Sequence, residues 1–132
     1  MIKHPLTKHV LFTDAELADP ETHETRFHPG FEPALLALRL DYNWPMRVTS
    51  CCRSAAHNLK VGGHPRSLHL MRNPYYKTEG TMAIDIALRD GSDKGALVSR
   101  ALGLGWSVGV AGWGVHLDRR RDIGLTQVLF TY

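Results

Sequence analysis

The sequence predicts a single α+β domain in which helices flank a small antiparallel sheet. Apolar residues at helical spacing mark residues 32–42 and 93–102, whereas short apolar segments such as 81–88 have the pattern of strands. Such a mixture of helices and short strands is typical of α+β folds. With 132 residues, the chain is long enough for one hydrophobic core and too short for two. We therefore expect residues 1–132 to form one domain.

Local signals define the elements along the chain. Thr13 and Glu16 form a capping box that begins a short helix, which Asp19-Pro20 ends. Pro33 suits the first turn of the next helix. The expected elements are, in order, an extended lead-in (1–12), a helix (14–18), a loop (20–30), a helix (32–42), a strand (46–50), a helix (54–59), an inserted loop (71–80), a strand (81–88), a helix (93–102), a glycine-rich strand and turn (105–112) and two strands (115–118 and 125–132).

The charge and the cysteines exclude several classes of protein. The formal net charge is only +3, and the densest basic cluster, residues 119–121, is far short of a nucleic-acid-binding stripe. Adjacent Cys51 and Cys52, without a Cys-x-x-Cys motif, indicate neither a disulfide framework nor a thiolate zinc site. The N-terminus lacks the apolar core of a signal peptide, and no apolar run reaches the ~20 residues that span a bilayer. We expect a monomer made in the cytoplasm, without nucleic-acid partners or stable membrane insertion.

Three side chains on separate elements have the character of metal ligands. His69 follows a Ser-Leu pair, Asp85 is the single charged residue of an apolar strand, and His116 belongs to the strand over 115–118. Catalytic zinc takes three ligands of this kind and keeps one position open. Ordinary roles are also open, because an isolated histidine is more often a core or surface residue. A strand aspartate is more often an ion-pair partner, since a buried charge needs a partner or a metal.

The motifs around these residues resemble those of the zinc D-Ala-D-Ala metallopeptidase family. That family includes DD-carboxypeptidases and phage endolysin peptidases, and its fold is shared with hedgehog signalling domains. The residues that carry the resemblance are Thr49, Ser50, Arg53, Ser54, Asn58, Val61, Gly62, Gly63, Ser67, His69, Ala83, Asp85, Val115, His116 and Asp118. They extend over nearly the whole chain, and several motifs in the right order are more specific than any one of them.

The resemblance implies one zinc ion per chain, bound by His69, Asp85 and His116. It also implies that Arg53 anchors the substrate, because a guanidinium fits a peptide carboxylate or a developing oxyanion. The alternative for this arginine is a surface role in capping a loop. Ser67 and Trp113 are further candidates, either for contacts close to the metal ligands or for substrate binding.

Two features depart from the family pattern. His69 and Asp85 are 16 positions apart, which is wider than usual in the family, so residues 71–80 form an insertion. Tyr75 in this insertion is a candidate substrate contact, although the insertion is equally consistent with a tolerated surface loop. In addition, residues 110–115 contain no side chain that can take a proton, where many members place a general base.

The nearest acid to the last ligand is Asp118, two positions after His116. Positions two apart share one face of a strand, so we expect Asp118 to shuttle the proton, unless it forms an ion pair with Arg119 or Arg120. Glu79 and His64 are alternative bases.

The resemblance therefore implies a zinc hydrolase, a metallopeptidase that cleaves an amide bond in the peptide part of bacterial peptidoglycan. It would act as an endolysin-like endopeptidase or a DD-carboxypeptidase. We expect it to reach the cell wall after release, as a phage or prophage lysin, or from a virion. The alternative is a non-catalytic, zinc-containing structural or binding protein of the same fold, such as a virion component. The missing base favours this alternative, whereas the intact ligand set and Arg53 favour the peptidase.

Overall fold

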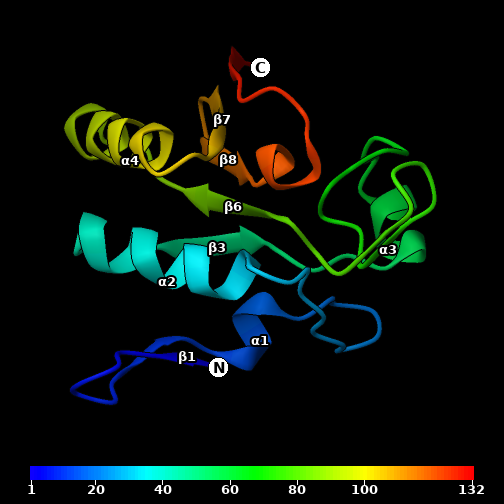
Figure 1. Cartoon of the computed structure of the whole chain (residues 1–132), viewed down its shortest axis with the longest axis horizontal. Coiled ribbons are helices and arrows are strands. Elements are labelled where there is room, and N and C mark those ends of the chain that lie inside the picture. The colour runs from blue at the N-terminus through cyan, green and yellow to red at the C-terminus, as the bar shows by residue number, and fades with distance from the viewer.

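The computed structural model describes all residues from 1 to 132 and confirms the α+β class (Figure 1). Its main sheet has five strands in the order β3-β6-β8-β7-β9. In that order the strands are β3 (Arg47–Ser50), β6 (Ala83–Ala87), β8 (Gly114–Asp118), β7 (Ser107–Ala111) and β9 (Leu129–Thr131). Neighbouring strands are antiparallel except β7 and β9, which are parallel, so the sheet is mixed.

The predicted helices are all present, with ends within two residues of the expected ones. They are α1 (Asp14–Leu17), α2 (Phe31–Tyr42), α3 (Ala55–Lys60) and α4 (Gly91–Gly103). A short 3₁₀-helix that the sequence analysis did not predict, η1 (Arg120–Ile123), follows β8. The capping box of Thr13 and Glu16 begins α1 as predicted. Ser54 caps α3 by accepting a hydrogen bond from the backbone N–H of His57. None of these helices combines the length and the apolar character needed to cross a bilayer.

The hydrophobic core lies between α2, α4 and one face of the main sheet. The two helices contact each other, and α4 also contacts β7 and β8. The fully buried side chains that these elements contribute to one core cluster include Leu35, Leu38, Ile84, Leu97, Val115 and Leu117. This core fixes which face of each strand points inward.

The strands β6 and β8 present their polar residues on the opposite face. Successive strand residues point to opposite sides of a sheet. With Ile84 and Leu117 directed into the core, Asp85, His116 and Asp118 share the other face. The alternation of apolar and polar residues thus places three side chains with metal or acid–base chemistry next to one another.

The N-terminal segment is more structured than the extended lead-in that we expected. It forms a separate two-stranded hairpin, β1 (Ile2–Lys3) and β2 (Val10–Phe12), and is not an edge of the main sheet. The turn contains Lys8 at a φ of 65°, a left-handed conformation for which a lysine gives no sequence signal. Phe12 is fully buried and attaches the hairpin to the core.

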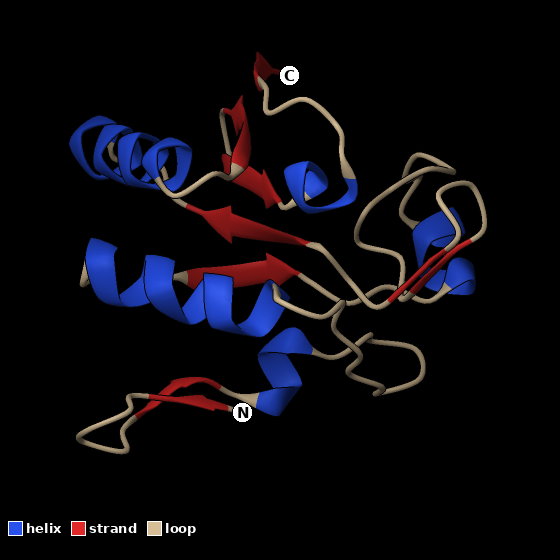
Figure 2. Cartoon of the chain, viewed as in Figure 1, coloured by secondary structure: helices blue, strands red, loops and turns tan.

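Two further segments also differ from the expected elements. The insertion over 71–80 is a hairpin, β4 (Arg72–Asn73) and β5 (Thr78–Glu79), at the same end of the molecule as α3 (Figure 2). The expected strand over 125–132 is shortened to β9, because only three of its residues pair with β7.

Candidate metal centre

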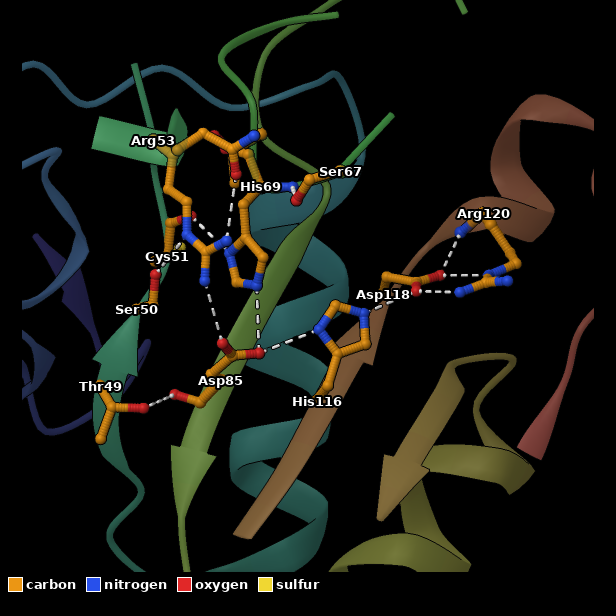
Figure 3. Close-up of polar contacts among 12 residues, drawn as sticks. Thr49, Ser50, Cys51, Arg53, Ser67, His69, Asp85, His116, Asp118 and Arg120 are labelled. Atoms are coloured by element: carbon orange, nitrogen blue, oxygen red, sulfur yellow. Dashed lines mark hydrogen bonds and ion pairs between the residues drawn. The ribbon is translucent and has the colours of Figure 1, made fainter. Parts of the chain in front are cut away.

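Two neighbouring strands bring Asp85 and His116 together. The residues are directly opposed in the register of β6 and β8. His116 Nδ1 lies 2.9 Å from Asp85 Oδ1 (Figure 3). The pair is therefore built by strand register alone and requires no loop.

His69 approaches the same oxygen from the segment that follows α3. Its ring is buried, and its Nε2 lies 3.1 Å from Asp85 Oδ1. Its Nδ1 donates to the backbone oxygen of Cys51 at 2.7 Å. A carbonyl oxygen only accepts hydrogen bonds, so Nδ1 carries a proton. Burial lowers the pKa of His69, which favours the neutral ring. The neutral ring then directs the Nε2 lone pair at a carboxylate, which is the arrangement a metal cation satisfies.

One ligand atom from each of His69, Asp85 and His116 can be chosen so that all three lie within 4.8 Å of one another. Two imidazole nitrogens and a carboxylate oxygen are ligands that zinc prefers. The donor atoms and their close spacing therefore fit a single zinc ion. The structure thus brings together the three residues that the sequence predicts as ligands.

Asp118 lies beyond His116, on the side of the ring away from Asp85 (Figure 3). Its Oδ2 accepts hydrogen bonds from His116 Nε2 at 2.8 Å and from the Arg120 guanidinium at 2.7 Å. Its Oδ1 accepts from the Nε and the backbone N–H of Arg120, both at 3.0 Å. Four donors occupy the four lone-pair sites of this carboxylate. The geometry favours orientation of His116 over the proton transfer that we expected from the sequence.

Arg53 is held rigidly beside Asp85. Its guanidinium donates to Ser50 Oγ at 2.9 Å, to Asn58 Oδ1 at 3.2 Å and to Asp85 Oδ2 at 3.3 Å. Its backbone pairs with the segment that carries His69, since Arg53 N–H donates to His69 O at 2.9 Å. Three of its five N–H donors are used, and the others remain for a ligand.

The remaining sequence candidates differ in their positions. Ser67 Oγ accepts a hydrogen bond from the backbone N–H of His69 at 3.2 Å, so this side chain supports the ligand segment. Trp113 and His64 line the cavity at the centre. Tyr75 does not line it, but the next residue, Tyr76, does.

Glu79 also lies away from the cavity. It is an exposed residue that forms an ion pair with Arg26 at 2.9 Å. This contact makes it a poor candidate for a general base.

A cavity of about 680 Å³ surrounds the candidate centre. Sequence reasoning missed several of its residues, notably Phe130 and Tyr132. They reach the site because β9 runs parallel to β7, and the Phe130 ring occupies the space that a side chain at Gly109 would fill. The glycine at position 109 was the only sequence signal for this packing, and a glycine does not indicate which strand lies against it.

One comparison with known proteins covers part of this site. The sequence profile of the peptidase M15 family matches residues 16–110, a span that includes Arg53, His69 and Asp85 and ends before His116. No curated protein and no solved structure matches the chain. The profile covers more than half of the sequence, so this chain belongs to the peptidase M15 family, the zinc D-Ala-D-Ala metallopeptidases.

Proposed function

We propose that this protein is a zinc-dependent peptidase that hydrolyses an amide bond in the peptide part of bacterial peptidoglycan, acting at the cell wall as a lysin or from a virion. Membership of the peptidase M15 family supports a metallopeptidase. The observation that carries the proposal is the group formed by His69, Asp85 and His116, whose ligand atoms lie within 4.8 Å of one another. This group lines a cavity large enough for several residues of a peptide.

The chain's own residues suit the binding of a peptide substrate. When bound by the three ligands, zinc supplies a Lewis acid that polarises the scissile carbonyl and lowers the pKa of a water molecule. The unused N–H groups of Arg53 would bind a carboxylate or a carbonyl oxygen of the peptide. Because Arg53 is fixed by Ser50, Asn58 and Asp85, it orients the substrate with little loss of side-chain entropy.

Asp118 acts as a positioning residue in this proposal. It accepts a hydrogen bond from His116 Nε2, which leaves Nδ1 directed at the metal position. Carboxylate–histidine pairs of this kind fix the tautomer and the ring orientation of a ligand. Arg120 in turn holds Asp118 through a bidentate ion pair.

One observation favours the alternative, a non-catalytic zinc-containing structural or binding protein. The carboxylates that line the cavity are Asp85 and Asp118. Asp85 belongs to the ligand group, and all lone-pair sites of Asp118 are occupied. A free carboxylate is therefore missing from the cavity in the resting arrangement, and His64, whose Nδ1 accepts a hydrogen bond from the backbone N–H of Arg66 at 3.0 Å, is the remaining candidate base that lines it. Turnover on cell-wall peptides distinguishes the two functions.

The test combines metal analysis with an assay of wall cleavage. We expect the purified protein to bind about one zinc ion per chain, to clear outer-membrane-permeabilised cells and to release new amino groups from purified peptidoglycan. His116→Ala should lose zinc and both activities, whereas His9→Ala, at an exposed histidine far from the cavity, should keep them. Zinc binding without cleavage of any wall type would support the non-catalytic alternative. Failure to bind zinc after reconstitution would reject both functions.

A further inference from the structure

Three arginines line the cavity, and one of them has no acidic partner. Arg53 forms an ion pair with Asp85 at 3.3 Å, and Arg120 forms one with Asp118 at 2.7 Å. Arg66 forms no ion pair with any carboxylate of the chain. Among the arginines of the cavity, Arg66 is therefore the one whose guanidinium is not neutralised by a carboxylate of the chain.

The insertion over 71–80 holds Arg66 in place. The Arg66 guanidinium lies 3.8 Å from the centre of the Tyr75 ring, in cation–π contact. Stacking on a ring leaves the edge of the guanidinium, with its fork of N–H donors, free for a ligand. Tyr76 packs against Tyr75 with ring centres 4.9 Å apart and lines the cavity itself.

Asn73 connects this insertion to the segment that carries His69. Its side chain is almost fully buried. Its amide nitrogen donates to the backbone oxygens of Arg66 at 3.1 Å and Ser67 at 3.2 Å. Its amide oxygen accepts from the backbone N–H groups of Tyr75 and Tyr76, both at 3.0 Å. The insertion is therefore a fixed part of the cavity wall, unlike a surface loop that lies free of the site.

We propose that Arg66, presented by the insertion, is a specificity-determining residue that binds a carboxylate of the peptide substrate, separate from the group that Arg53 binds. The inference rests on the proposed function, since it names the preferred substrate class, an acidic peptide. Guanidinium groups bind carboxylates through two parallel hydrogen bonds, and a free Arg66 offers this geometry. A neutral peptide of the same length would leave Arg66 without a partner.

The test compares three synthetic peptides of the peptidoglycan stem with the full-length, zinc-loaded protein. One peptide carries free side-chain carboxylates, the second has them amidated, and the third has only its C-terminal carboxylate amidated. We expect the first to be hydrolysed with a kcat/KM about three- to fivefold above that of the second, mainly through KM, as suits a partly exposed ion pair. If the third peptide is instead hydrolysed with a lower kcat/KM than the first, and the second is not, the carboxylate bound by Arg66 is the C-terminal one.

The variants assign the preference to Arg66. Arg66→Gln should hydrolyse the two side-chain forms at equal rates, with kcat unchanged, and Arg66→Lys should restore part of the preference. Tyr75→Ala, which removes the stacked ring, should weaken it. The matched control is Arg72→Gln, because Arg72 is an exposed arginine of the same insertion that lies near Glu79 and outside the cavity. The inference would be overturned if wild type and Arg66→Gln preferred the peptide with free side-chain carboxylates over the amidated peptide to the same extent.

Peptide binding, measured by calorimetry on the same proteins, separates this inference from the proposed function. If no peptide is hydrolysed but the acidic peptide binds more tightly and Arg66→Gln abolishes the difference, the peptidase function fails and the role of Arg66 stands. If peptides are hydrolysed with no preference among them, the function stands and the role of Arg66 is rejected. Higher salt should also reduce the preference in wild type, since it rests on charge.

Discussion

His116 Nε2 lies 2.8 Å from Asp118 Oδ2, on the side of the imidazole ring away from the Asp85 oxygen that Nδ1 approaches at 2.9 Å. Burial opposes a charge on this ring. The two carboxylates outweigh that effect and raise the pKa of His116 to about 9 in the metal-free protein. When Nδ1 binds a metal ion, the ring keeps only the proton that it donates to Asp118. The buried aspartate thereby selects the nitrogen that faces the metal.

Asp118→Asn should therefore weaken zinc binding by about 10- to 100-fold, the usual effect of removing a carboxylate behind a histidine ligand. Competition with a chromophoric chelator measures this affinity. The matched control is Asp122→Asn, because Asp122 also forms an ion pair with an arginine, Arg119, but lies outside the cavity. Unchanged zinc affinity together with lost hydrolysis would instead identify Asp118 as the proton shuttle.

Zinc should also stabilise the fold. A ligand that binds only the native state raises the free energy of unfolding by about 4 kcal/mol when its free concentration is 1,000 times its Kd. We expect a chelator to lower the Tm of the wild-type protein in scanning calorimetry, and added zinc to restore it. Asp85→Asn, which removes the shared carboxylate, should show a Tm that does not depend on zinc. A zinc-dependent Tm in this variant as large as in wild type would place the metal elsewhere.

The sequence was sufficient to predict the two strands that carry Asp85 and His116. The apolar residues of 81–88 predicted a strand in which Asp85 is the single charged residue, and residues 115–118 predicted a strand that carries His116. Neither pattern shows that the two strands are adjacent, because strand pairing depends on the whole chain. The shared face of His116 and Asp118 followed from the period of two and was confirmed.

The partners of charged residues could not be predicted in the same way. The sequence offered Arg119 and Arg120 equally as partners for Asp118, and the structure pairs Asp118 with Arg120 because η1 directs Arg119 toward Asp122. Phe130 of β9 and the following Tyr132 reach the cavity through a parallel pairing with β7 that no local signal indicates. The contacts of Asn73 likewise depend on a hairpin within a segment that has no strand pattern.

Gly63 is needed for the position of Arg53. A Cβ at this residue would overlap the side-chain amide of Asn58 and touch the Arg53 guanidinium. Gly63→Ala should therefore displace the hydrogen bond between Asn58 and Arg53, lower the free energy of unfolding by about 1–3 kcal/mol and raise KM for peptides more than it lowers kcat.

Urea unfolding and steady-state hydrolysis measure the two effects of this substitution. Gly91→Ala is the matched control, because no atom lies within 4 Å of a Cβ built at the first position of α4. If both substitutions change KM equally, the role assigned to Gly63 is wrong.

Asp19 links the segment after α1 to the loop that carries Arg53, and it should make stability depend on pH. Its buried carboxylate accepts hydrogen bonds from the Ser54 N–H at 2.8 Å and from the N–H and hydroxyl of Thr22 at 2.8 and 2.9 Å. Burial alone would raise the pKa of Asp19, but these hydrogen bonds outweigh it and lower the pKa below 3.8. The folded state thus favours the ionised form more than the unfolded state does.

The stabilisation from Asp19 is therefore complete above the pKa of the unfolded chain and disappears as the pH falls through the lower pKa of the folded protein. We expect Asp19→Asn to lose about 1–3 kcal/mol of unfolding free energy at pH 7. The difference from wild type should narrow below pH 3.8, the ordinary value for an aspartate. Urea unfolding across this range measures it, with Asp41→Asn, at an exposed residue paired with Arg100, as the control. If the difference in unfolding free energy between wild type and Asp19→Asn stays constant through the acid range, Asp19 stabilises the fold through its shape and not through its charge.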